Sequence, residues 1–152
     1  MCYFHGNCLK TEVLHSAVNY LSRREHSALE LMDKLKTKGY SSTDISVIIE
    51  YLQEKNYQSD QRFAECSIRN RASRGYGWLY IKQMLKQKGV CENIINEEAK
   101  NQQIDWYLQA ELAYNKRFAG IVIKDEKDKA KRLRFMQSRG FTLDQIFTLI
   151  NK

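Results

Sequence analysis

The sequence predicts an all-α protein built from three tandem three-helix units. First, the 152 residues include no proline, which favours helices, because helix interiors exclude proline and the turns of β-rich folds use it. Second, a glycine recurs at Gly39, Gly89 and Gly140, at intervals of 50 and 51 residues. Third, apolar residues around each glycine recur every three or four positions, the period of an α-helix that buries one face.

The segments around these glycines share further positions. They are LKTKGYSSTDISVII, LKQKGVCENIINEEA and MQSRGFTLDQIFTLI. The shared positions are Leu35, Leu85 and Met136 four before the glycine, Tyr40, Val90 and Phe141 one after it, and Ile45, Ile95 and Ile146 six after it. Such coincident offsets indicate an internal repeat. A unit of about 50 residues buries little apolar surface alone, so we expect the units to stack into an elongated, curved array.

Glycine and capping residues predict the boundaries within each unit. We place an N-terminal tail at residues 1–12 and the units at residues 13–58, 59–103 and 104–152. The glycine ends the second helix, where a left-handed conformation costs it little. The third helix then begins at a capping residue, Ser41 with Asp44 in the first unit and Thr142 with Gln145 in the last. Cys91 is a weaker cap at the same place in the middle unit.

The second helices are expected to begin twelve residues before each glycine, at Ser27, Gly77 and Asp128. Ser27 with Glu30 has the spacing of a capping box. The apolar face of the middle unit's second helix is predicted to be Trp78, Ile81 and Leu85.

Apolar stripes predict the buried faces of the remaining helices. For the first helices these are Leu14, Ala17, Val18 and Leu21; Phe63, Ala64 and Ile68; and Ile104, Tyr107, Leu108 and Leu112. For the third helices they are Ile45, Ile48, Ile49 and Leu52 in the first unit and Leu143, Ile146, Phe147 and Ile150 in the last. The strand-like stretch GIVI, residues 120–123, is interpreted as a connector whose apolar residues pack against the last unit.

Positive charge increases along the chain. The net charge of +7 divides into 0 for residues 1–59, +3 for residues 60–103 and +4 for residues 104–152. Residues 62–90 contain one acid, Glu65, and seven cations, which are Arg62, Arg69, Arg71, Arg74, Lys82, Lys86 and Lys88. A helical basic face with aromatic residues nearby is typical of proteins that bind nucleic-acid phosphates, and a solvated lysine face is the alternative.

No motif indicates catalysis, a cofactor or a bound metal. The Gly-Tyr-Gly of residues 75–77 lacks the lysine and hydroxyl of a nucleotide-binding loop and follows no strand. Cys2, His5 and Cys8 supply three of the four ligands that a structural zinc site needs, so we predict no metal site. His26 is expected to make local contacts at a helix start. Scattered cysteines and the absence of a long apolar segment predict a cytoplasmic protein with free thiols and no membrane anchor.

Three blocks of sequence resemble the RecX family, bacterial regulators of the RecA recombinase. They are RREHSALELMDKLKTKGY, DQRFAECSIRNRASRGYGWLYIKQMLKQKGV and KDKAKRLRFMQSRGF, and the resemblance covers residues 14–150. It implies three tandem three-helix repeats. Trp78 departs from the pattern, because the family commonly has proline after Gly-Tyr-Gly; a tryptophan there can act as a packing anchor instead.

The resemblance also implies a function. A RecX-like protein is expected to bind the RecA filament on single-stranded DNA and inhibit its ATPase, strand-exchange and co-protease activities, as a monomer and without chemistry of its own. The candidate filament or DNA contacts are Arg69, Arg71, Arg74, Tyr76, Lys82, Lys86, Lys88, Lys131, Arg134 and Arg139. Two alternatives remain open at this point: a free-standing DNA-binding protein with helix-turn-helix-like units, and a helical scaffold that binds only proteins.

Overall fold

Nine helices account for the regular structure of the part of the chain that the computed structural model describes, the backbone of residues 3–151 and the side chains of residues 10–151. They are α1 (Tyr3–Arg23), α2 (Ala28–Thr37), α3 (Ser42–Glu54), α4 (Asp60–Ser73), α5 (Trp78–Gln87), α6 (Glu92–Gln102), α7 (Trp106–Phe118), α8 (Glu126–Ser138) and α9 (Leu143–Ile150). No helix among these residues is long and apolar enough to cross a membrane.

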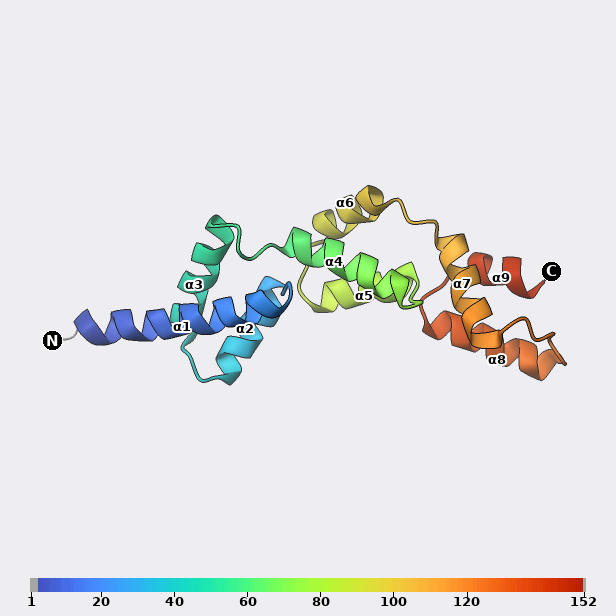
Figure 1. Cartoon of the computed structure of the whole chain (residues 1–152), viewed down its shortest axis with the longest axis horizontal. Coiled ribbons are helices and arrows are strands. Elements are labelled where there is room, and N and C mark those ends of the chain that lie inside the picture. Colours follow the sequence, from blue (N-terminus) through green and yellow to red (C-terminus); the bar gives the residue numbers. More distant parts are fainter. Residues whose placement is uncertain (1–2, 152) are drawn as a thin grey trace.

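The helices form three successive groups of three along an elongated molecule. In Figure 1, α1–α3 lie at one end, α4–α6 in the middle and α7–α9 at the other end. Each group encloses its own apolar cluster, centred on Leu31 and Ile45 in the first unit, Ile81 and Ile95 in the second and Met136 in the third. The predicted all-α fold of three three-helix units is therefore confirmed, and each unit has a separate core.

The three repeated glycines end their helices as predicted. Gly39, Gly89 and Gly140 have φ values of +93°, +79° and +97°, a region that side-chain-bearing residues rarely adopt. The residue after each glycine donates its backbone N–H to a carbonyl one turn back, at Leu35, Leu85 or Met136. The glycine and the apolar residue four positions before it thus belong to one helix-ending motif.

Two of the predicted starts of the second helices are confirmed and one is wrong. The Ser27 hydroxyl accepts the Glu30 N–H at 3.1 Å, and Gly77 occupies the N-cap position of α5 without a side-chain bond. In the third unit the cap is Asp125, whose carboxylate accepts the Asp128 N–H at 2.8 Å. Asp128 lies in the first turn of α8, because a better-placed carboxylate three residues earlier extends that helix.

The third helices begin where capping predicted. Ser41 accepts the Asp44 N–H, and Thr142 forms a complete capping box with Gln145. Cys91 holds the N-cap position of α6 without a side-chain hydrogen bond. In α3 the whole predicted apolar stripe is buried, but in α9 only Ile146 and Ile150 are buried, whereas Leu143 and Phe147 are largely exposed.

The first helices of the outer units differ from the prediction. Backbone helix begins at Tyr3, so residues 3–12, which we placed in a tail, belong to α1. In α7 the predicted stripe is wrong: Tyr107, Leu108 and Leu112 are about half exposed, and Ala110 is the buried residue. Small side chains allow α7 to approach the core of the third unit closely, which turns its larger apolar residues outward.

The GIVI segment is a connector rather than a strand, but only Ile123 packs against the third core. Ile121 and Val122 are exposed, and their carbonyl oxygens accept hydrogen bonds from the guanidinium of Arg132 at 2.8 and 3.4 Å. Arg132 is only 3% exposed and also binds Asp128. A buried arginine therefore holds this connector where apolar packing was expected.

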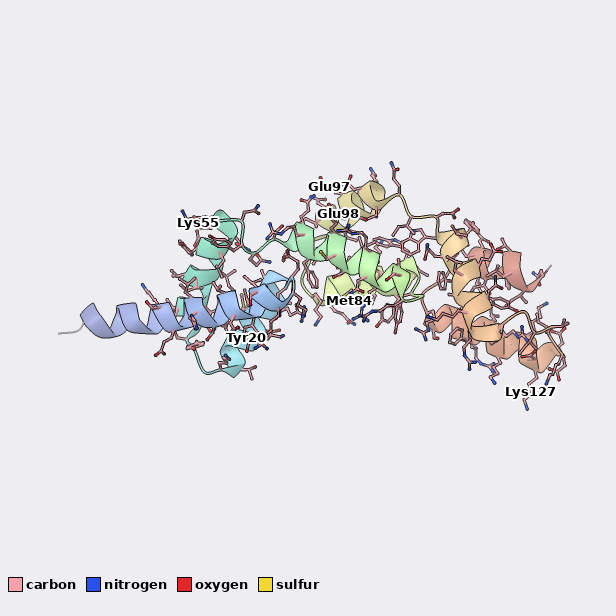
Figure 2. The ribbon with its side chains drawn as sticks, viewed as in Figure 1. Tyr20, Lys55, Met84, Glu97, Glu98 and Lys127 are labelled. Atoms are coloured by element: carbon pink, nitrogen blue, oxygen red, sulfur yellow. The ribbon has the colours of Figure 1, made fainter. Side chains whose placement is uncertain are left out.

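Buried polar groups also hold the middle unit together. Glu98 on α6, labelled in Figure 2, is 4% exposed. Its carboxylate accepts a hydrogen bond of 2.8 Å from Gln61 on α4. Trp78 packs against Trp106 with ring centroids 5.9 Å apart, so it anchors the start of α5 against the start of α7. This confirms the packing role expected for Trp78.

The same contact joins each pair of neighbouring units. The glycine turn of one unit lies against the start of the second helix of the unit before it. At the junction of the second and third units, which we call the second junction, Gly77 N–H donates to Arg139 O at 2.7 Å and Leu79 N–H donates to Gly140 O at 3.0 Å. At the first junction, a Cβ at Gly89 would lie 2.9 Å from the Cβ of Leu29.

The close contact at the second junction predicts that a good capping residue at position 77 lowers the stability of the protein. A Cβ at Gly77 would lie 2.5 Å from the carbonyl carbon and oxygen of Gly140. We expect Gly77→Ser to lower the free energy of unfolding by about 1 to 3 kcal/mol, because the clash outweighs the added cap. The measurement is the midpoint of urea unfolding followed by circular dichroism.

The matched control is Cys91→Ser, which places serine at another uncapped N-cap position that is exposed. Here serine should stabilise by about 1 kcal/mol, because it gains the cap without a clash. An unfolding midpoint for Gly77→Ser at or above that of the parent chain would contradict the role of close approach at the second junction.

Candidate functional site

At the junction of the first and second units, which we call the first junction, an internal carboxylate pairs with two cations. Glu30, at the third position after the α2 cap, accepts hydrogen bonds from both terminal nitrogens of Arg24 at 2.9 and 3.0 Å. Lys88, which precedes the glycine of the next unit, approaches the same carboxylate at 3.2 Å. The Glu30 side chain therefore binds across the junction and leaves the capping box with Ser27 half formed.

The surroundings of Glu30 lower the pKa of its carboxyl below the ordinary value of 4.5. Burial by itself would raise this pKa, but the hydrogen bonds and positive charges of Arg24 and Lys88 outweigh burial. The carboxylate thus keeps its charge to a lower pH than an ordinary glutamate, and it pairs with both cations while offsetting one of their two positive charges.

His26 positions Arg24 at this junction. Its imidazole is buried, with Nδ1 3.0 Å from the carbonyl oxygen of Arg24 and Nε2 3.2 Å from the ammonium of Lys34. Burial lowers the pKa of His26, and the ammonium of Lys34 can donate only to a neutral ring nitrogen. The local contacts expected for His26 are therefore confirmed.

The second junction is a pocket lined by cations and no carboxylate. Its volume is about 240 Å³. The lining residues are Arg74, Gly75, Ala113, Lys116, Arg117, Phe135 and Arg139. None of the four cations forms a salt bridge to a described carboxylate. Since the turn after α4, the helices α7 and α8 and the turn after α8 all contribute to the wall, the pocket exists only when the second and third units are joined.

Arginine and aromatic side chains alternate in a row that passes through this pocket at Arg139, Phe135 and Arg117, and we call this row the cation–aromatic ladder. Its members in order are Arg71, Tyr76, Arg139, Phe135, Arg117, Phe118, Arg132 and Tyr114, with guanidinium-to-ring distances of 4.7 to 5.8 Å. Tyr76 also stacks on Tyr80 with ring centroids 4.3 Å apart. Such contacts hold the guanidinium groups in place without neutralising their charge. Of the four arginines, only Arg132 also forms a salt bridge to a described acid, Asp128.

The candidate contacts predicted from sequence do not form one cluster. Arg74, Tyr76 and Arg139 meet at the second junction. Arg71 lines a larger groove beside the first junction, of about 420 Å³, and Arg74 lines both spaces. Lys88 also lines this groove, but its charge is used by Glu30.

The remaining candidates lie outside the pocket. Arg69 is exposed and pairs with Glu65 one turn away on α4. Lys82 and Lys86 lie one turn apart on α5, and neither pairs with a described acid. Lys131 and Arg134 line a third hollow, on the last unit, where Asp125 and Asp128 supply negative charge. Lys127, at the start of α8, lines the same hollow near the C-terminal end of the molecule (Figure 2).

Sequence reasoning missed two pocket cations, Lys116 and Arg117. They belong to the last turn of α7, where basic residues commonly complement the helix dipole, so their charge alone gave no reason to select them. Their place in the repeat could have identified them, because the last turn of α7 lies beside the turn after α8 that contains Arg139. Cys2, His5 and Cys8, for which we predicted no metal site, lie outside the described side chains.

Comparison with known proteins divides the chain into the same three units. Family models described as the first, second and third three-helix domains of RecX match residues 14–52, 59–97 and 105–150, respectively. The chain belongs to the RecX family. A protein of Vibrio parahaemolyticus named Regulatory protein RecX is 42% identical over 131 residues, which cover 86% of this chain and 84% of the relative. The Regulatory protein RecX of Halorhodospira halophila is 36% identical over 134 residues, or 88% and 83% of the two chains.

Solved structures of RecX proteins share the fold. The crystal structure of RecX from Lactobacillus salivarius superposes with a TM-score of 0.75 at 24% identity, over 95% of this chain and 96% of that one. A second RecX crystal structure gives the same TM-score at 20% identity. At these identities the similarity concerns the arrangement of helices. The RecX assignment itself depends on the three domain matches and the relatives of higher identity.

The ion pairs of Glu30 at the first junction of this RecX-family protein predict how its stability depends on pH. Because the folded-state pKa of Glu30 lies below its unfolded value, its charge stabilises the fold above pH 4.5, and the contribution is lost as the pH falls through the folded pKa. Glu30→Gln should lower the urea midpoint at pH 7, by about 1 kcal/mol in free energy. It should also reduce the loss of stability between about pH 5 and 3.

The control is Glu50→Gln, because Glu50 is exposed on α3 and has no ion pair among the described residues. Urea midpoints are measured for the three proteins across this pH range. Equal pH slopes for the parent and Glu30→Gln would show that the Glu30 carboxylate does not stabilise the first junction.

Proposed function

We propose that this chain binds the RecA filament on single-stranded DNA and inhibits its ATPase, strand-exchange and co-protease activities. In the cell it would act in the cytoplasm as a monomeric regulator of recombination, DNA repair and the SOS response. The observation that carries this proposal is the full set of three RecX domains in their proper order. Relatives that match most of the chain are named regulatory proteins.

The shape and charge of the molecule support this proposal. An elongated array can contact several neighbouring subunits of a filament at once, which a compact domain of the same length could not do (Figure 1). Its second and third units carry all of the net positive charge. We infer that these two units meet DNA phosphates or acidic protein surface, and that the neutral first unit mainly contacts protein.

Inhibition of this kind requires no catalytic residue in the regulator. ATP turnover in a filament requires neighbouring subunits to change their relative positions. A ligand that binds one arrangement across two subunits shifts the population toward that arrangement by its difference in affinity. Rigid junctions between the units favour such clamping, because flexible junctions would let the regulator follow the movement.

Binding to three targets tests the proposal and its rivals. Affinity is measured at one fixed salt concentration for naked single-stranded DNA, naked duplex and recombinase-coated single-stranded DNA, together with the rate of ATP hydrolysis. Preference for the coated strand with a falling ATPase rate supports the regulator. A sequence-selective duplex complex would instead support a free-standing DNA-binding protein, and binding that ignores DNA would support a protein scaffold.

Charge reversal on α5 gives a quantitative prediction. Lys82→Glu with Lys86→Glu should weaken binding to the filament by about tenfold or more, since two cations that face no internal acid become anions. If both lysines bind phosphates of single-stranded DNA, the slope of log affinity against log salt should become shallower by about 0.7 for each phosphate that is no longer bound. Binding is followed by fluorescence anisotropy of labelled filament DNA.

The control carries the same change in net charge on the neutral first unit, Lys36→Glu with Lys55→Glu. Both lysines are exposed (Lys55 is labelled in Figure 2), and neither pairs with a described acid. If the control and the α5 variant lose affinity equally, the effect belongs to net charge, and the α5 face is excluded from the interface.

A further inference from the structure

The two junctions of the molecule contain the same cations at equivalent positions. Arg24 and Arg74 each stand three residues before the N-cap of a second helix, Ser27 or Gly77. Lys88 and Arg139 each stand one residue before the glycine of the following unit. At the first junction, Arg24 and Lys88 both contact Glu30. At the second junction, Arg74 and Arg139 both line the pocket.

The junctions differ in the residue that should neutralise these cations. In the first junction Glu30, three residues after the cap, receives both of them. Three residues after the cap of α5 stands Tyr80, so the second junction lacks the carboxylate. Lys116 and Arg117 add two more positive charges to the same pocket. Four cations around about 240 Å³ repel one another unless an anion enters from outside.

We propose that the second-junction pocket binds backbone phosphates of single-stranded nucleic acid, in the place that Glu30 occupies in the first junction. The proposal rests on the proposed function and adds its DNA-contacting site. The pocket binds the strand directly, without help from the recombinase. Arg74 and Arg139 take the positions that grip the internal carboxylate at the first junction, and Lys116 and Arg117 supply the charge for a second phosphate.

Three features favour nucleic-acid phosphate over a partner's carboxylate. Four uncompensated cations suit successive phosphates better than one acidic side chain. Arginine forks match phosphate oxygens in pairs, and the ladder holds Arg117 and Arg139 against rings that fix their orientation. Beside the pocket, Tyr80 is 36% exposed and stacks on Tyr76, which Arg139 covers. A cationic groove beside an exposed aromatic ring is the usual arrangement for binding single strands, because bases stack on the ring.

The first test removes pocket charge without touching the ladder. Arg74→Gln with Lys116→Gln is compared with Lys36→Gln with Lys55→Gln, which removes two exposed charges from the first unit. The probe is a fluorescein-labelled oligothymidylate without recombinase, and the readout is anisotropy. We expect the pocket variant to lose about tenfold in affinity and the control to change little.

The second test restores the missing carboxylate. Tyr80→Glu gives the second junction a carboxylate at the position of Glu30, so Arg74 and Arg139 gain an internal partner that offsets one of their charges. Tyr80→Gln removes the same ring without adding charge. We expect Tyr80→Glu to bind the oligonucleotide more weakly than Tyr80→Gln by about tenfold, while its thermal midpoint stays equal or rises. This pair keeps the proposal testable even if the first variant fails to fold.

The outcomes separate this inference from the proposed function. Unchanged oligonucleotide affinity in the pocket variant, or equal affinity for Tyr80→Glu and Tyr80→Gln, overturns the phosphate site. If those variants instead lose affinity only for the recombinase filament, the pocket receives a carboxylate of the protein partner, and the inference is wrong while the regulator remains. Equal competition by duplex of the same length also overturns the preference for single strands. The proposed function fails separately, if the unsubstituted chain leaves filament ATPase unchanged.

Discussion

Close contact between a glycine turn and the start of a helix in the preceding unit is the constraint on which the rest of the structure depends. At the second junction, Gly77 and Gly140 approach within distances that leave no room for a Cβ on either residue. Two backbone hydrogen bonds then fix the register of the units. This register brings the cation before the glycine beside the cation before the cap. At the second junction this backbone contact therefore determines which cations meet, and the side chain three residues after the cap decides whether they face an internal carboxylate.

Local signals predicted the fold well because capping and helix termination are local events. The repeated glycines, Ser27, Ser41 and Thr142 all act within one turn of their own helix, so one sequence suffices to place them. Two outcomes differed. Asp125 instead of Asp128 caps α8, which is also a local contact but lies outside the twelve-residue offset on which the prediction relied. In α7, Ala110 is buried while Leu112 is exposed, which depends on tertiary packing and cannot be inferred from periodicity.

The candidate site was only partly predictable for the same reason. Arg74, Tyr76 and Arg139 were selected from basic segments of the sequence, and they do meet at the second junction. Lys116 and Arg117 were not selected, because their link to Arg139 arises from the packing of α7 against α8. Lys88 was selected for its charge, yet that charge is used by Glu30. A count of cations along the sequence therefore includes one residue of the second unit whose charge is already paired, and omits two residues of the third unit that line the pocket.

Positive charge in the third unit serves two purposes that compete for the same residues. Among the described side chains, the apolar cluster of this unit has five buried members, against eight in each of the other two, so side chains at its surface must contribute more to holding the helices together. Arg132 does so through its hydrogen bonds to the connector, and the ladder extends this role to Arg117 and Arg139. Because aromatic rings attract cations without cancelling their charge, Arg117 and Arg139 can stabilise the unit and still attract an external anion. An internal carboxylate in their place would offset that charge, as Glu30 does at the first junction. The ladder thus makes it possible for a small helical unit to be stable while its charge remains available.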